Sequence, residues 1–400
     1  MLQRKSFVLW IFAFLCLYQP LTAQTETDEG ALLEVENGVS FSQNSLFLLN
    51  LRFRMQNRFG FTTKAGNTID VNQFEARVRR LRLRFDGYVL NPKFSYYIQL
   101  SFSKADQDLE LGTVPQTIRD AMFYYHISQN FYVGLGQSKL PGNRQRVISS
   151  GNLQFTDRSL ANAIYTLDRD FGFFAYYTLP FSDGPVFNIK GAITTGDGRN
   201  ASPVNEGLAY TGRVEVLPFG EFINSGDYSE GDLEFETTPK LSLGLSMSVN
   251  KKASRTGGQL GRELYGFRDI HALIADMMFK YQGWMLSSEY LQRNVNNPFT
   301  QNAEGDIRYI ITGWGWNTQL SRMISPKAEL AFRYTAVNPN DKMEGYERHI
   351  EESTLGSTYY LNRHRIKIQG NITYRWYDTN TELSHENNRW GAMFQIEFGI

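Results

Sequence analysis

Cysteine is nearly absent from this chain, which contains one among its 400 residues. That residue, Cys16, lies in an N-terminal segment with the features of a secretory signal. These are the basic Arg4 and Lys5, an apolar stretch at 7–18, and a small-residue cleavage site that ends at Ala23. A chain cut after Ala23 contains no cysteine. This excludes a disulfide framework and cysteine-based metal or thiol chemistry in the mature protein.

The sequence also lacks a second long apolar run and a net charge. No segment after the signal approaches the roughly 20 apolar residues that a membrane-spanning helix needs. The 41 basic residues balance 41 acidic ones, so the overall charge does not favour a nucleic-acid partner. The five histidines are scattered and show no metal-ligand spacing such as HExxH. We therefore expect no metal and no other cofactor.

Alternation of polar and apolar residues is the dominant pattern of the chain. Three stretches place arginine or lysine on every second residue with a large apolar residue between: 51–59 (LRFRMQNRF), 80–85 (RLRLRF) and 365–376 (RIKIQGNITYRW). Side chains on a strand alternate between its faces, so each stretch has a cationic and an apolar face. A soluble all-β sandwich, or two soluble domains, is one interpretation. The recurrence of the pattern and the 14% aromatic content favour a membrane barrel with a polar lumen and aromatic girdles.

The alternation recurs in sixteen segments, each near the roughly 9–11 residues of a tilted membrane strand. We predict strands at 45–59, 71–86, 94–102, 119–127, 131–137, 170–179, 187–194, 208–217, 241–250, 270–281, 284–293, 309–320, 327–337, 353–361, 363–377 and 389–400. The apolar positions change phase between Phe74 and Leu81, which predicts a β-bulge near Arg79 and Arg80. Short turns alternate with long polar links, except that the link at 218–240 is long where a short turn is expected.

These features predict an all-β fold, a transmembrane antiparallel β-barrel of 16 strands in the outer membrane of a Gram-negative cell. Short periplasmic turns would lie at one end and long extracellular loops at the other. The predicted organisation is a signal peptide at 1–23, a periplasmic lead-in at 24–44 and the barrel at 45–400.

Several motifs resemble those of the phosphate-selective porin O and P family, in the form common among Bacteroidetes-type bacteria. They are residues 74–88 (FEARVRRLRLRFDGY) followed by 94–102, then 134–141 (GLGQSKLP), 153–159 (LQFTDRS) and 169–172 (RDFG). The resemblance implies a homotrimer of sixteen-stranded barrels whose third long loop, here 138–169, folds inward and narrows the pore. In the family's phosphate-selective members, wall arginines are joined by a lysine cluster on that loop. This loop instead offers Lys139, Arg144, Arg146 and Arg158.

The alternation also predicts which basic residues face the lumen. Closing the barrel would bring the last two strands beside the first two and join their bases into one stripe. The predicted anion path consists of Arg52, Arg54, Arg58, Arg80, Arg82, Arg84, Arg365, Lys367, Arg375 and Arg389. Guanidinium groups suit phosphate, carboxylate and sulfate because their donors match the oxygens of these anions. The alternative is that these arginines pair with lumen carboxylates such as Asp86 and Glu397 and only stiffen the wall.

The sequence therefore predicts an outer-membrane porin for passive diffusion of small hydrophilic solutes, with a modest preference for anions that could include phosphate. Its expected partners are outer-membrane lipid and lipopolysaccharide, small anionic or neutral solutes, and further copies of the chain. A different class of function is a non-conducting scaffold or accessory barrel that binds a partner through its loops. We do not expect an enzyme. The candidate lipid-hydrolysing pair is His271 with Ser288, and the glycine-rich 195–198 fits a hairpin tip better than a calcium loop.

Overall fold

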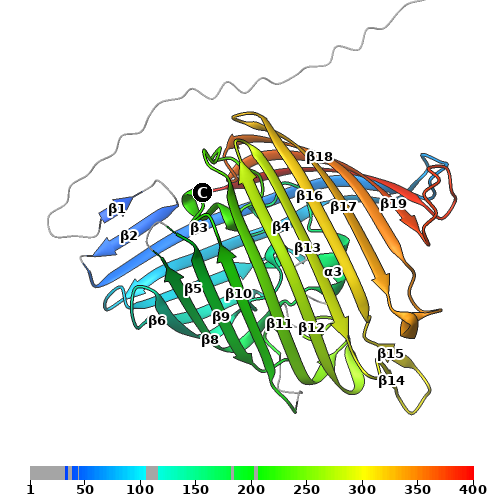
Figure 1. The fold of residues 1–400 in the computed structure, drawn as a ribbon, viewed down its shortest axis with the longest axis horizontal. Helices are drawn as coiled ribbons and strands as arrows, with labels where there is room; N and C mark the ends of the chain where they lie inside the picture. The colour runs from blue at the N-terminus through cyan, green and yellow to red at the C-terminus, as the bar shows by residue number, and fades with distance from the viewer. Residues whose placement is uncertain (1–31, 35–37, 44, 105–115, 182–183, 202–205) are drawn as a thin grey trace, which may run out of the picture.

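The computed structural model describes residues 32–34, 38–43, 45–104, 116–181, 184–201 and 206–400. The predicted signal peptide at 1–23 lies outside these residues. The fold is a closed barrel of sixteen antiparallel strands, in which the last strand pairs with the first (Figure 1). The predicted fold class is confirmed.

Each barrel strand pairs with its neighbours in the chain, from β3 at the start to β20 at the end. The sixteen strands are β3 (Phe47–Thr63), β4 (Val71–Val89), β5 (Phe94–Ser101), β6 (Ile118–His126), β7 (Phe131–Lys139), β8 (Arg169–Pro180), β9 (Val186–Thr194), β10 (Ala209–Leu217), β11 (Lys240–Arg255), β12 (Glu263–Tyr281), β13 (Trp284–Asn294), β16 (Gly313–Ser325), β17 (Ala328–Pro339), β18 (Ile350–Asn362), β19 (Ile366–Tyr377) and β20 (Arg389–Gly399). They correspond one to one with the predicted segments, and several extend further at the long-loop end.

Side-chain exposure follows the predicted alternation. On β11, Ser242 and Ser246 are 0% and 1% exposed, whereas Leu243 and Met247 between and after them are 44% and 59% exposed. The polar residues thus point into the barrel and the apolar residues point outward. A soluble sandwich would place them the other way round, so this arrangement identifies the outer surface as the one that meets lipid.

The predicted bulge on the second strand is present. Gln56 of β3 pairs with Arg80 of β4, and the next residue, Asn57, pairs with Val78, so Arg79 has no opposite residue. A second bulge occurs on β6, where Gln99 and Leu100 of β5 pair with Asp120 and Ile118 and leave Arg119 unopposed. We did not predict this second bulge.

Two strands lie before the barrel in a region where the sequence predicted only a lead-in. β2 (Val39–Gln43) pairs with the start of β3, and β1 (Leu32–Glu34) pairs with β2 (Figure 1). The last strand, β20, covers β3 only from Arg54 to Thr62. β2 therefore supplies backbone hydrogen-bond partners to the first part of β3, which β20 does not reach.

Two segments fold into the barrel. The first, 140–168, joins β7 to β8 and contains two short helices, α2 (Arg144–Val147) and α3 (Leu160–Tyr165). α3 lies inside the ring of strands, against β13, β16 and β17 (Figure 1). Gly315 on β16 permits this close contact, because a Cβ there would lie 2.8 Å from Ala161 Cβ.

The second inward segment is the unexpectedly long link 218–239 between β10 and β11, which contains the 3-10 helix η1 (Ile223–Tyr228). Two of the long links at the other end of the barrel contain further elements. The link between β13 and β16 contains a small hairpin, β14 (Phe299–Gln301) with β15 (Ile307–Tyr309), and the link between β17 and β18 contains the 3-10 helix η2 (Asp341–Met343). Among the helices that the structure describes, none has the length and apolar character to cross a membrane.

Candidate functional site: a guanidinium-lined cavity in the lumen

The inward basic residues of β3, β4, β19 and β20, here called the arginine wall, form one continuous surface. β20 pairs with both β19 and β3, and β3 pairs with β4, so residues from the two ends of the chain are neighbours. Between this wall and the 140–168 segment lies a cavity of about 1080 Å³. Its basic lining residues are Arg52, Arg54, Arg79, Arg80, Arg82, Arg84, Arg119, Lys139, Arg146, Arg158, Arg169, Arg333, Arg365, Arg375 and Arg389, and its acidic ones are Asp157 and Glu352.

The 140–168 segment crosses the lumen and is held on opposite sides. On the far wall, Arg144 donates to Asp276 of β12 at 2.8 Å and to Ser242 of β11 at 2.8 Å. Beside it, the backbone amide of Gln145 donates to Glu289 of β13. At the arginine wall, Arg54 donates to Ser149 and Arg82 donates to Ser150, both at 3.0 Å. Together these contacts fix the segment across the lumen, between the far wall and the arginine wall.

The link 218–239 supports the crossing segment from the short-turn end. The amide of Glu230 donates to the carbonyl of Asn152 at 2.8 Å, and the Glu230 carboxylate accepts from the amide of Gln154 at 2.8 Å. Lys280 of β12 anchors the link by donating to the carbonyl of Gly226 at 2.7 Å. The two inward segments thus fill the lumen beside β10–β13, and the guanidinium-lined cavity remains on the opposite side.

Some wall arginines are paired with carboxylates, as the alternative interpretation proposed. Arg54 lies 3.0 Å from Glu397, and Arg84 lies 2.7 Å from Asp86. Arg375 pairs with Glu352 at 2.5 Å. These pairs orient the guanidinium groups and reduce their net charge, so the wall is both stiffened and cationic.

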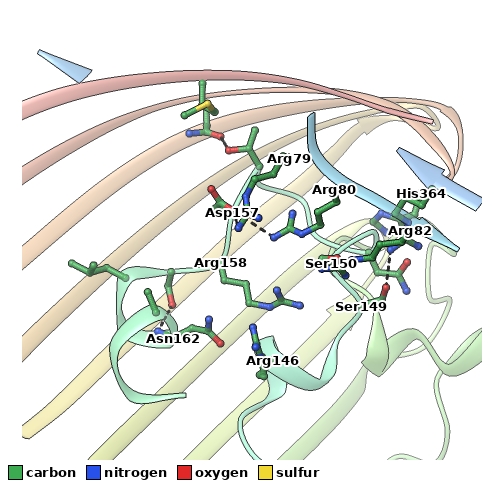
Figure 2. Close-up of a pocket in the computed structure, with 18 of the residues that line it drawn as sticks. Arg79, Arg80, Arg82, Arg146, Ser149, Ser150, Asp157, Arg158, Asn162 and His364 are labelled. Carbon is green, nitrogen blue, oxygen red and sulfur yellow. Dashed lines mark hydrogen bonds and ion pairs between the residues drawn. The ribbon is translucent and has the colours of Figure 1, made fainter. Parts of the chain in front are cut away.

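Asp157 is the acidic residue around which the wall and the crossing segment meet. Arg58 contacts its carboxylate at 2.5 Å. Arg79 and Arg80 lie 3.7 and 3.6 Å from the same carboxylate (Figure 2). Burial opposes ionisation, but the guanidiniums of Arg58 and Arg79 outweigh it and hold the pKa of Asp157 well below its usual range. This carboxylate therefore stays charged and holds three arginines together.

Other cations of the cavity use neutral acceptors. Arg158 donates to the carbonyls of Gln145 and Ile148 at 2.6 and 2.8 Å, and Lys139 donates to the carbonyl of Val147 at 2.9 Å. Among the residues the structure describes, neither forms an ion pair. Burial and the nearby guanidiniums, first that of Arg146, lower the pKa of Arg158 to about 9, so it remains cationic at neutral pH.

The guanidinium groups converge from different elements. Figure 2 shows Arg80 and Arg82 of the wall and Arg146 and Arg158 of the crossing segment around one space. Two unit charges about 4 Å apart interact by about 4 kcal/mol at an effective dielectric near 20, against about 1 in bulk water. The crossing segment therefore strengthens the attraction for anions in two ways. It adds the cations Arg146 and Arg158 to the cavity, and it narrows the aqueous path beside them.

Three predicted site residues do not line the cavity. Arg144 is fully buried against Asp276 on the far wall, where it anchors the crossing segment. Lys367 is fully buried and donates to the carbonyls of Gly151 and Leu153 at 2.8 and 2.6 Å. Arg58 is buried against Asp157. Each of these side chains holds the crossing segment in place. The remaining predicted residues lie around the one cavity.

Four lining arginines were not predicted. Arg79 and Arg119 are the unopposed residues of the two bulges, and a bulge re-aims a side chain that simple alternation would direct outward. The phase change that located the first bulge could have identified Arg79. Arg169 opens β8 and makes two contacts to Asp120, at 2.8 and 3.0 Å. Arg333 of β17 contacts the crossing segment, since it donates to the carbonyl of Asp157 at 2.8 Å and its guanidinium lies 4.5 Å from the Phe155 ring.

The structure does not bring His271 and Ser288 together as a catalytic pair, and it does not form a calcium loop at 195–198. In the strand register His271 pairs with Asn294 and Ser288 pairs with Met277, so the two are well separated along β12 and β13. The glycine-rich 195–198 instead surrounds a carboxylate, since the amides of Gly196 and Gly198 donate to Asp170 at 2.7 and 3.2 Å. That loop is the end of a hairpin.

Comparisons with known proteins agree with this architecture. The family model described as phosphate-selective porin O and P matches residues 49–398. An anion-selective porin from Comamonas acidovorans has a similar structure, with a TM-score of 0.56 and 12% identity over 88% of this chain and 100% of that one. The outer membrane channel DcaP of Acinetobacter baumannii has a TM-score of 0.53 and 13% identity, over 91% of this chain and 100% of that one. OprB of Pseudomonas putida has a TM-score of 0.52 and 10% identity, over 88% of this chain and 94% of that one. At these identities the similarity concerns the fold. No curated protein sequence matches the chain.

Proposed function

The chain belongs to the phosphate-selective porin O and P family, and from this premise we propose that small anions diffuse across the outer membrane along its arginine wall. The observation that carries the proposal is the convergence of guanidinium groups from the wall and the crossing segment on one cavity, in which the acidic lining residues are Asp157 and Glu352. A lumen surface of one sign concentrates counter-ions and raises their rate of entry. Family membership favours this channel over a non-conducting scaffold.

The anion path in this proposal consists of the predicted residues that line the cavity, together with Arg79, Arg119, Arg169 and Arg333. Arg58, Arg144 and Lys367 act as positioning residues that hold the crossing segment. That segment is the constriction. Its basic residues are Arg144, Arg146 and Arg158, and the amino group of Lys139, at the end of β7, is occupied by backbone carbonyls. We therefore expect a general preference for oxyanions rather than selectivity for phosphate alone.

The proposal includes export by the predicted signal peptide, assembly as a homotrimer, and transport without catalysis. The outward rings of Phe59, Phe74 and Phe394 on adjacent strands are 54%, 65% and 45% exposed, and they offer an apolar surface for lipid or for another copy. Native mass spectrometry of the detergent-solubilised protein would measure the number of subunits. A monomer as the dominant species would contradict the trimer.

The function is tested by reversal potentials of the purified protein in a planar bilayer with asymmetric potassium chloride or potassium phosphate. We expect anion preference in the unaltered channel and a shift toward cation preference when Arg82 and Arg158 are changed to Gln. Gln keeps hydrogen-bonding capacity at both positions but removes the charge. Arg262→Ala in an exposed loop outside the cavity is the matched control and should not shift the potential. A protein that never conducts, or a double variant with unchanged selectivity, would contradict the proposal.

A further inference from the structure

A row of aromatic side chains lines the lumen at the short-turn ends of β5–β8, next to the arginine wall. It consists of Tyr97, Tyr124, Tyr132 and Tyr176, one from each strand, and is called here the tyrosine row. Tyr97 and Tyr124 share the inward phase of the buried Gln99 and Asp120 on their strands. All four rings are partly exposed. Tyr97, Tyr124 and Tyr176 also pack against buried residues such as Met122 and Phe174, but their partial exposure leaves an aromatic surface on a lumen wall that is normally polar.

Two rings of the row, those of Tyr132 and Tyr176, are held upright by stacking. The Tyr132 and Tyr176 rings lie 4.6 Å apart with an interplanar angle of 13°, close to the spacing of neighbouring strands. His126 covers the other side of Tyr132 at 5.0 Å. Rings that stack along the direction between strands stand perpendicular to the wall. Their edges and hydroxyl groups therefore face the lumen.

Tyr124 completes this surface because its neighbour is glycine. A Cβ at Gly134 would lie 2.8 Å from Cδ1 of Tyr124, so the ring lies directly over the glycine. Tyr124 meets Tyr132 edge to face, at 5.8 Å and 77°. The edges of aromatic rings carry partial positive charge and accept the face of another ring. The upright rings thus present edges to which the face of a further aromatic ring can bind.

The row is joined to the cationic cavity at Tyr97. The Arg84 guanidinium lies 4.7 Å from the centre of the Tyr97 ring, and Arg52, Arg84 and Tyr97 line the same cavity. Tyr97 is the member of the row that lines this cavity, so a solute at this junction meets the guanidinium groups on one side and reaches the row through Tyr97 on the other. An aliphatic anion could use only the first of these surfaces.

We propose that the tyrosine row and Arg84 form a binding site for small aromatic carboxylates, with the ring against the tyrosines and the carboxylate at the guanidinium. This inference rests on the proposed anion channel and specifies one class of solute for it. Charge complementarity selects the carboxylate, and edge-to-face contact selects the planar ring.

The experiment compares benzoate, acetate and benzamide as blockers of chloride current through single channels. We expect benzoate to block at a concentration about 5-fold lower than acetate, a factor that corresponds to ~1 kcal/mol. Benzamide, which has the ring without the charge, should block more weakly than benzoate. In Tyr132→Ala/Tyr176→Ala the advantage of benzoate over acetate should disappear. Thr178→Ala, another inward position on β8, should retain it.

Equal block by benzoate and acetate in the unaltered channel would overturn the site, and this comparison requires no variant to fold. Equal block by benzoate and benzamide would overturn the role of Arg84. Either result can occur in a channel that conducts and prefers anions, so it would refute this inference and leave the proposed function intact. Loss of conductance or of anion preference in the unaltered protein would instead refute the proposed function.

Discussion

The anchor between the crossing segment and the far wall offers a quantitative test of the lumen architecture. Arg144 is fully buried and contacts Asp276 at 2.8 Å, Ser242 at 2.8 Å and the carbonyl of Asp227 at 3.1 Å. Removing one member of a buried ion pair costs about 3–5 kcal/mol when its partner is left without compensation. Here Asp276 keeps two contacts to Arg213, at 2.6 and 2.9 Å. Arg144→Met should therefore cost only the charge-assisted hydrogen bonds, about 2 kcal/mol.

The free energy of unfolding would be measured by urea titration in detergent micelles. Asp269→Asn is a matched control, because Asp269 lies on β12 like Asp276 but forms an exposed ion pair. Its carboxylate lies 2.7 Å from Lys251, and both side chains are nearly half exposed. An exposed pair of this kind contributes about 0–1 kcal/mol. In bilayers, Arg144→Met should also raise single-channel conductance and current noise, since the crossing segment loses its hold on β12.

Two outcomes would refute this reasoning. A loss of more than about 4 kcal/mol would mean that Arg213 does not compensate Asp276. A loss no larger than that of Asp269→Asn, with unchanged conductance, would mean that Arg144 does not hold the segment.

Two further predictions concern the short-turn end. Burial and the Lys367 ammonium lower the pKa of His364 well below 6.5; the unfolded chain therefore binds the proton first, and the free energy of unfolding should fall as pH drops from 7 to 5. His364→Gln should flatten this pH dependence in urea titrations, and an unchanged slope would show that other groups cause it. Replacing the link 218–239 by a two-residue Asn-Gly turn should raise single-channel conductance, because the segment that supports the crossing loop is lost. Conductance equal to that of the unaltered channel would contradict this.

The strands and their facing directions could be predicted because they depend on local alternation. Leu243 and Met247 face outward and Ser242 faces inward because successive side chains on a strand point to opposite faces. Contacts with distant residues do not change these directions. The phase change before Leu81 even located a bulge. The closure of the barrel then placed Arg389 opposite Arg375 and brought β20 beside the strand that carries Arg54 and Arg58, without further information.

The contents of the lumen could not be predicted in the same way. Arg144 and Lys367 have the pattern of accessible cations, but each is buried by a segment that arrives from elsewhere in the chain. The link 218–239 is long at the end of the barrel where short turns are expected, and this showed that it is an exception. That it folds into the lumen depends on contacts such as that of Lys280 with Gly226. Arg333 shares the inward phase of Glu329, but its place at the cavity depends on the crossing segment, since it donates to the carbonyl of Asp157 at 2.8 Å and lies 4.5 Å from the Phe155 ring. Such contacts join residues more than 50 positions apart, and alternation carries no information about them.

The two bulges suggest how the lumen of such a barrel can be altered in evolution. Each bulge is one extra residue in a strand, and it changes which side chains upstream of it face inward. Insertion or deletion of a single codon within β4 or β6 would therefore exchange the inner and outer residues of half a strand while the neighbouring strands remain paired. In a wall where arginines and apolar residues alternate, one such event could add or remove several positive charges at once. Solute preference could then shift in large steps, which single substitutions would not produce.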